Sequence, residues 1–174
     1  MSTLPKLILV QDKAFITGPE ANELHQQGSF GELEEGRLTL LDVEALFLIE
    51  KDKALVSDSS GRVMTFPELV EHFSKKDPDF WLRYLLYSDL RRRGYIVKPG
   101  YGPKLEFRVY RRGAVAGKEP AKYLIYGLVE GKTISLSELR AISNKAKLSK
   151  KDLVLAVIDR QGDITYYDTT EIIF

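Results

Sequence analysis

Two apolar runs in the second half of the chain place the strongest constraint on its fold. Residues 122–129 and 153–159 are apolar enough to be interior strands of a sheet. Between them, Ser135 and Glu138 have the spacing of a capping box, which predicts a helix over about 135–147. The sequence therefore predicts a sheet flanked by helices in this half of the chain.

A helix and a strand are expected before these runs. Residues 77–79 and Gly94 are typical start and stop signals, and they predict a helix between them. Residues 105–110 alternate in polarity, which predicts a strand with Phe107 on its apolar face. Its polar face is expected to present Glu106, Arg108 and Tyr110.

The first half of the chain predicts a compact α+β unit without a catalytic constellation. Expected strands and helices alternate in it, with strands at 6–10, 13–16 and 37–40, helices at 19–26, 41–51 and 66–75, and a two-stranded hairpin around 57–61. The predicted fold class is α+β with two small domains: an N-terminal mixed α/β domain, 1–79, and a C-terminal domain, 80–174, with a mixed sheet flanked by helices.

Composition excludes several kinds of site. The chain has no cysteine, which excludes disulfides and thiolate chemistry. His25 and His72 are the only histidines, and they fall on charged helix faces without a second ligand, so no metal site and no cofactor are expected. No apolar run is long enough for a membrane span, and the start of the chain has no secretory signal pattern, so we expect a cytoplasmic protein. Two Asn and four Gln against 29% charged residues are a balance found in heat-adapted proteins.

The charge is unevenly distributed. Residues 1–79 contain 8 Lys and Arg against 15 Asp and Glu, a net charge of −7, whereas residues 80–174 contain 18 against 10, a net charge of +8. A polyanion is therefore expected to bind the second domain.

Over its whole length, the second domain resembles the catalytic domain of archaeal tRNA-intron (tRNA-splicing) endonucleases. The resemblance rests on six segments: Arg92–Lys98, Phe107–Tyr110, Ala121–Ile125, Leu136–Leu139, Leu153–Asp159 and Gly162–Tyr167. In the first domain, Phe30-Gly31 and residues 41–50 look like the N-terminal domain of the same family.

The resemblance implies an activity and its residues. Family members cut pre-tRNA at a bulge-helix-bulge by attack of a ribose 2′-OH, which leaves a 2′,3′-cyclic phosphate and a 5′-OH end. A tyrosine abstracts the proton, a histidine protonates the leaving oxygen, and a lysine stabilises the charged phosphorane. In this chain the tyrosine position is Tyr110 and the lysine position is Lys151.

Two positions depart from the family pattern. The histidine position is Pro120, which has neither a titratable group nor an N–H. An arginine that clamps a bulge base is replaced by Asn144, which cannot form a cation–π contact. The scaffold without these groups resembles a structural subunit, which implies a catalytic sister subunit, an α2β2 heterotetramer and no membrane partner.

The remaining expected contacts follow from charge and from the resemblance. RNA contacts are expected from six basic residues: Arg108, Arg111, Arg112, Lys145, Lys147 and Lys150. The resemblance implies subunit contacts through an acidic turn with Asp159 and Asp163, and through an apolar C-terminal strand with Ile172, Ile173 and Phe174.

Three functions remain open from the sequence. The first is a structural subunit that holds a catalytic sister chain and pre-tRNA. The second is a self-sufficient homo-oligomeric endonuclease in which Glu119 replaces the histidine, although an ordinary carboxylate is mostly ionised at neutral pH. The third is a non-enzymatic RNA-binding module that uses only the positive charge of the second domain.

Overall fold

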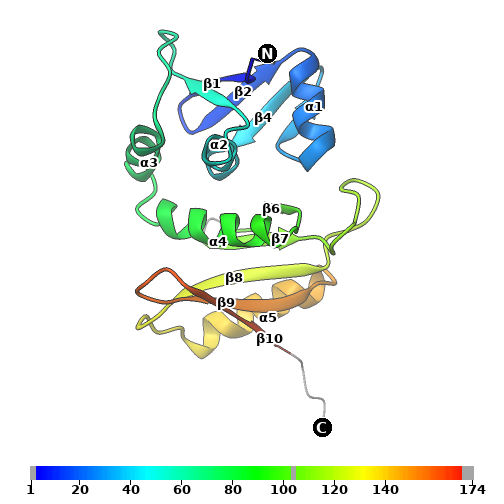
Figure 1. The fold of residues 1–174 in the computed structure, drawn as a ribbon. Coiled ribbons are helices and arrows are strands. Elements are labelled where there is room, and N and C mark those ends of the chain that lie inside the picture. The colour runs from blue at the N-terminus through cyan, green and yellow to red at the C-terminus, as the bar shows by residue number, and fades with distance from the viewer. Residues whose placement is uncertain (1–2, 103–104, 170–174) are drawn as a thin grey trace. The chain divides into compact units, whose positions relative to one another are not determined.

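The chain consists of two compact units in the computed structural model, which describes residues 3–102 and 105–169. The units are Met1–Tyr84 and Leu85–Phe174, so the division falls within helix α4 (Phe80–Arg92). Each unit contains a five-stranded mixed sheet with helices (Figure 1), which confirms the predicted α+β fold class.

The sheet of unit 1 has the strand order β3-β4-β2-β1-β5, in which only β1 and β5 pair in parallel. Its elements are β1 (Lys6–Val10), β2 (Lys13–Thr17), α1 (Pro19–Gly28), β3 (Glu32–Glu34), β4 (Arg37–Leu41), α2 (Asp42–Glu50), β5 (Leu55–Ser57) and α3 (Phe66–Ser74).

Helix α2 forms the centre of the unit 1 core. Residues 43–48 are all buried, as expected of a helix that is apolar on nearly every side. The buried Glu44 carboxylate accepts the backbone N–H groups of Gly31 at 3.0 Å and Leu41 at 2.9 Å. Gly31 has φ 62°, and a Cβ there would lie 2.5 Å from the Thr39 carbonyl oxygen, so only glycine fits.

Two expectations for unit 1 were wrong. The short strand β3 was not predicted, because its alternation of two exposed glutamates around Leu33 covers only three residues, too few to indicate a strand. The hairpin around 57–61 has only one strand, since β5 pairs with β1 and the other arm makes a single bridge between Ser57 and Val63. The Asp58 carboxylate accepts the N–H groups of Ser60 and Arg62 and closes the turn between these arms.

The sheet of unit 2 has the strand order β10-β9-β8-β7-β6, in which β8 and β9 pair in parallel and the other pairs are antiparallel. Its elements after α4 are β6 (Val97–Pro99), β7 (Glu106–Val109), β8 (Tyr123–Val129), α5 (Leu136–Leu148), β9 (Asp152–Ile158) and β10 (Ile164–Asp168).

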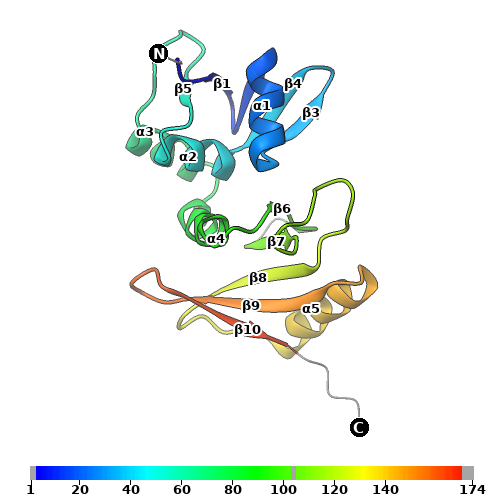
Figure 2. The ribbon, with the colours of Figure 1, turned by 45° about the vertical axis from the view of Figure 1, so that its right-hand side comes forward.

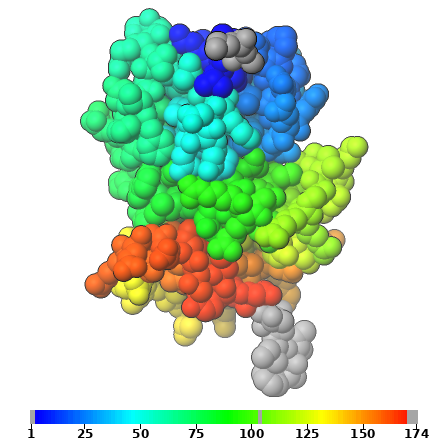
Figure 3. Space-filling view, in the orientation of Figure 1, coloured from blue at the N-terminus to red at the C-terminus, as the bar shows by residue number. Residues whose placement is uncertain are grey.

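Unit 2 has three layers, with α4 on one face of the sheet and α5 on the other (Figure 2). On the α4 face, the rings of Tyr87 and Phe107 lie 5.9 Å apart. On the α5 face, a buried cluster contains Leu124 and Leu153 together with Ile142 of the helix. The loop between β7 and β8, yellow-green in Figure 3, protrudes from the surface of this unit.

The predicted helix signals act as expected. The Ser135 hydroxyl accepts the N–H of Glu138 at 3.1 Å, and the Glu138 carboxylate accepts the N–H of Ser135 at 3.2 Å, which completes the capping box of α5. Helix α4 ends before Gly94, which has φ 90°.

Candidate RNA-processing site

Strand register brings three separate segments to one end of the sheet in unit 2. The Lys122 N–H donates to the Val109 carbonyl oxygen at 3.0 Å, and the Asp152 N–H donates to the Lys122 carbonyl oxygen at 3.0 Å. The end of β7 and the starts of β8 and β9 therefore coincide. Tyr110 and Lys151 are the residues next to these strand ends, so they lie at the same end of the sheet.

The same two residues belong to the α5 face. Arg108 pairs with Leu124, which packs against α5, and Tyr110 lies two residues after Arg108, directly beyond the end of β7. Lys151 lies two residues before Leu153, which packs in the same cluster. Because side chains alternate along a strand, Arg108 belongs to the α5 side of the sheet, and continuing the alternation by one residue beyond these strands assigns Tyr110 and Lys151 to the same side.

Tyr101 lies near two of these cations, and its sequence context gave no sign of this. The Arg108 Cζ lies 5.4 Å from the centre of its ring and the Lys151 Nζ lies 5.8 Å from it. Partial burial opposes ionisation of the phenol, but the hydrogen bond and charge of Lys151, together with the charge of Arg108, lower the pKa of Tyr101.

The loop that presents Tyr101 is anchored by a buried carboxylate. Glu106 was expected on the polar strand face, and it is 4% exposed. One carboxylate oxygen accepts the Tyr101 N–H at 3.1 Å and the other accepts the Lys145 ammonium at 3.1 Å. A Cβ at Gly100 would lie 2.6 Å from the Glu106 Cγ, so the glycine allows this close approach. Lys145, the partner of Glu106, is 39 residues away in sequence, so the alternation of polarity could not predict that Glu106 is buried.

Tyr110 itself is half-buried, and its N–H donates to the Ile96 carbonyl oxygen at 3.1 Å. Pro120 and Glu119 are exposed in the loop between β7 and β8. The two histidines belong to unit 1, where the His25 Nδ1 lies 2.9 Å from the Phe30 carbonyl oxygen and the His72 Nε2 lies 2.6 Å from the Gln11 carbonyl oxygen.

The basic residues predicted to bind RNA occupy different environments. Arg108 donates through Nε to the Pro99 carbonyl oxygen at 2.7 Å, and Lys145 is paired with Glu106. Arg112 lies over the Tyr95 ring, with Cζ 4.8 Å from the ring centre. Arg111, Arg112, Lys147 and Lys150 are exposed.

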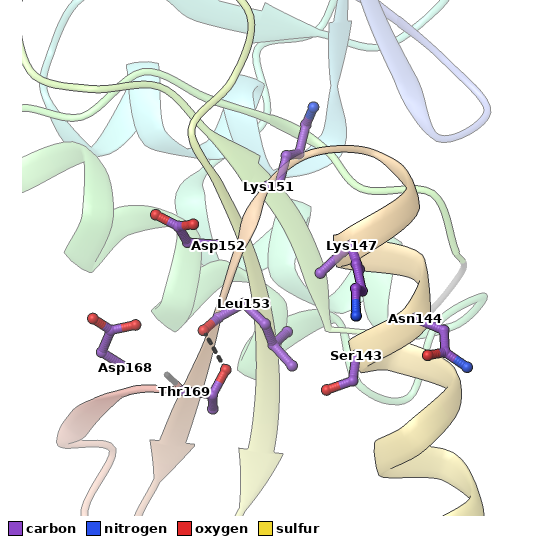
Figure 4. A pocket seen from close by; sticks show the side chains of 9 residues that line it. Ser143, Asn144, Lys147, Lys151, Asp152, Leu153, Asp168 and Thr169 are labelled. Carbon is purple, nitrogen blue, oxygen red and sulfur yellow. Dashed lines mark hydrogen bonds between the residues drawn. The ribbon is translucent and has the colours of Figure 1, made fainter. Parts of the chain in front are cut away.

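A cavity of about 480 Å³ lies between α5 and the ends of β9 and β10. Asn144 and Lys147 line it from α5, while Asp168 and Thr169 line it from the end of β10. In Figure 4 the side chains of Lys147 and Lys151 point in different directions. The two ammonium groups therefore do not converge on a single position in this cavity.

The acidic turn between β9 and β10 is held by one of its own carboxylates. Asp159 Oδ1 accepts the N–H groups of Gln161 at 2.8 Å and Asp163 at 2.9 Å, while the Asp163 side chain is exposed. The other predicted subunit contacts, Ile172, Ile173 and Phe174, lie outside the described residues.

The described residues offer neither a metal site nor a membrane-spanning helix. Residues 3–102 and 105–169 contain no group of three His, Cys, Asp or Glu side chains arranged to hold a metal ion. Within the same residues, no helix is long and apolar enough to cross a membrane.

Comparisons with known proteins agree with this architecture. Residues 6–70 match the model of the tRNA intron endonuclease N-terminal domain, and residues 80–166 match that of the tRNA intron endonuclease catalytic C-terminal domain. The tRNA-splicing endonuclease of Thermococcus onnurineus is 40% identical over 157 residues, which cover 90% of each chain. That of Pyrococcus furiosus is 38% identical over 168 residues, which cover 96% of each chain. These matches span both units, and the chain therefore belongs to the tRNA intron endonuclease family.

Proposed function

We propose that this chain is a structural subunit of a tRNA-splicing endonuclease, which supports a catalytic sister chain in removing introns from pre-tRNA in the cytoplasm. The single observation that carries the proposal is Pro120, which occupies the position that the family resemblance assigns to the acid histidine. Proline cannot donate a proton to a leaving oxygen. Neither histidine of the chain belongs to unit 2, and each ring contacts a backbone carbonyl oxygen of unit 1.

The retained part of the site supports a role in binding RNA. Tyr110 and Lys151 lie next to strand ends at the same end of the sheet, and the exposed residues Arg111, Arg112 and Lys150 are close to them in sequence. In the complete enzyme, we expect a sister chain with tyrosine, histidine and lysine to cut at the bulge-helix-bulge. There the 2′-OH attacks the adjacent phosphate and the products are a 2′,3′-cyclic phosphate and a 5′-OH end. An α2β2 heterotetramer supplies such a sister chain.

A cleavage assay tests the proposal. The purified chain is incubated with intron-containing pre-tRNA alone, and then after mixing with a family member that retains all three catalytic residues. We expect intact RNA in the first case and two specific cuts in the second. Specific cutting by the chain alone would contradict the proposal.

The same assay separates the self-sufficient alternative. If Glu119 supplied the acid, the chain alone would cut and Glu119→Gln would abolish the cutting. A non-enzymatic RNA-binding module would instead bind paired and bulged RNA with equal affinity, and its affinity for both would fall as the salt concentration rises.

A further inference from the structure

Tyr101 has an exposed aromatic side chain, and its backbone N–H is held by a buried carboxylate. Its side chain is 47% exposed, while its backbone N–H is bound to a carboxylate that is 2% exposed. The carboxylate, on Glu106, is held in turn by Lys145 on helix α5. A backbone that is already held at this residue loses little conformational entropy when the side chain binds a ligand.

Two cations lie beside the ring and keep donors for a ligand. Arg108 donates through Nε to the Pro99 carbonyl oxygen. The four N–H groups on its two terminal nitrogens take no part in that bond and can donate to a phosphate. Lys151 donates to the Ser149 carbonyl oxygen at 3.2 Å and forms a hydrogen bond with the Tyr101 phenol, so one of its three ammonium protons is left for a ligand. Both positive charges lie within 6 Å of the ring centre.

We propose that Tyr101, Arg108 and Lys151 form a binding site for one unpaired nucleotide of the RNA substrate. The base stacks on the Tyr101 ring, and the phosphate lies on the guanidinium and the ammonium. The inference rests on the proposed function for its choice of RNA as the ligand.

The chemistry of the site favours an unpaired nucleotide over the other polyanions. A base in a duplex is stacked on its neighbours, whereas a base in a bulge can be turned out onto an aromatic ring. An acidic protein segment would use the two cations but has no need of the ring. Loss of the ring alone therefore distinguishes a nucleotide from an acidic segment.

The test uses the full chain and a bulge-helix-bulge RNA with 2′-deoxyribose at both cleavage positions, so that no cutting occurs in any variant. Tyr101→Leu removes the ring, Tyr101→Phe keeps it, and Tyr167→Leu is the matched control. Tyr167 is 54% exposed on β10 of the same unit. Affinity is measured for this RNA and for a duplex without bulges, and 2-aminopurine at each bulge position reports stacking through its fluorescence.

We expect Tyr101→Leu to weaken binding of the bulged RNA by about 10- to 100-fold, to restore the fluorescence of one 2-aminopurine, and to leave duplex binding unchanged. Tyr101→Phe and Tyr167→Leu are expected to bind both RNAs as the wild type does. The inference is wrong if Tyr101→Leu binds bulged RNA normally, or if it loses affinity for both RNAs equally. A change in subunit assembly at constant RNA affinity would also overturn it in favour of a protein partner. Because the RNA cannot be cut, these outcomes are independent of whether the chain alone is catalytic.

Discussion

Lys145 and Glu106 form an ion pair of 3.1 Å that joins helix α5 to the first residue of β7. The Glu106 side chain is 2% exposed and the Lys145 side chain is 39% exposed. The pair therefore lies where the core meets the surface. The positive charge of the lysine offsets the free-energy cost of removing the carboxylate from water.

The first prediction concerns this pair. Lys145→Met leaves the Glu106 charge buried without its cation, so we expect a loss of about 1–3 kcal/mol in the free energy of unfolding. Urea denaturation measures the loss, and Lys147→Met, an exposed residue of the same helix, should change little. Adding Glu106→Gln to Lys145→Met removes the unpaired charge and should recover part of the stability. Equal stability of Lys145→Met and wild type would show that the pair contributes nothing.

The second prediction concerns the alkaline limit of stability. The Tyr166 hydroxyl donates to the Asp89 carboxylate at 2.6 Å. Burial, followed by this hydrogen bond and the charge of Asp89, raises the pKa of Tyr166. The folded chain then keeps a proton that the unfolded chain loses above about pH 10, so stability falls as the pH rises beyond that value.

Tyr166→Phe should therefore flatten the decline of stability above about pH 10, and at neutral pH it should cost about 1–2 kcal/mol. Urea denaturation between pH 7 and pH 11 measures both effects. Tyr167→Phe on the same strand is the control, because this side chain is 54% exposed. An unchanged alkaline slope in Tyr166→Phe would refute the assignment.

The third prediction concerns the acid limit. The Thr65 N–H donates to Glu68 Oε2 at 2.7 Å and Arg62 Nη1 donates to Glu68 Oε1 at 2.7 Å. These hydrogen bonds lower the pKa of Glu68 from 4.5 to about 2. The bond from the Thr65 backbone has the larger effect, and the bond from the Arg62 side chain follows. This contribution is fully present above pH 4.5 and disappears as the pH falls towards about 2.

Glu68→Gln should consequently make the stability of the chain less dependent on pH between 4.5 and about 2. Thermal unfolding across this range measures the effect. Glu71→Gln is the control on the same helix, since Glu71 is exposed and its contact with Lys75 is longer, at 3.6 Å. Parallel pH profiles of Glu68→Gln and wild type would contradict the prediction.

The fourth prediction restores the missing acid. Pro120→His places a titratable side chain at the position that the resemblance assigns to the histidine, while Tyr110 and Lys151 are already present. A positioned acid contributes on the order of 10² or more in rate, so we expect the variant alone to begin cutting pre-tRNA. Cutting should require the protonated imidazole and decline above about pH 6.5. Pro120→Ala, which adds no acid, should stay inactive; equal activity of the two variants would contradict this reasoning.

The fifth prediction concerns salt. If Lys151 contacts a phosphate, Lys151→Met should reduce the slope of log affinity against log salt by about 0.7 for single-stranded RNA. Lys53→Met, an exposed residue of unit 1, should leave the slope unchanged. Identical slopes for Lys151→Met and wild type would exclude this phosphate contact.

Local signals were sufficient for most of the fold. The capping box at Ser135 and Glu138 and the glycine stop at Gly94 act between neighbours in sequence, so they predicted the helix ends. The alternation in residues 105–110 placed Phe107 in the core correctly, with an exposure of 2%. Strand β3 was missed because its pairing with β4, rather than its own pattern, makes it a strand.

The candidate site could be predicted only in part. The resemblance pointed to Tyr110 and Lys151, and alternation placed Arg108 on the polar face. Tyr101 was missed because its neighbours Arg108 and Lys151 meet it only after β7 and β9 have joined the sheet. The burial of Glu106 was missed for the same reason, since it depends on a lysine of α5.

The exposure of Pro120 has a consequence for how this family diverges. The residue lies in a protruding loop, and the strand register that gathers Tyr110 and Lys151 is set by backbone bonds elsewhere. Folding therefore places little constraint on which side chain stands at position 120. A substitution at this position can therefore change the chemistry of the loop while the sheet keeps its register, so that sequence variation here is separate from the requirements of folding.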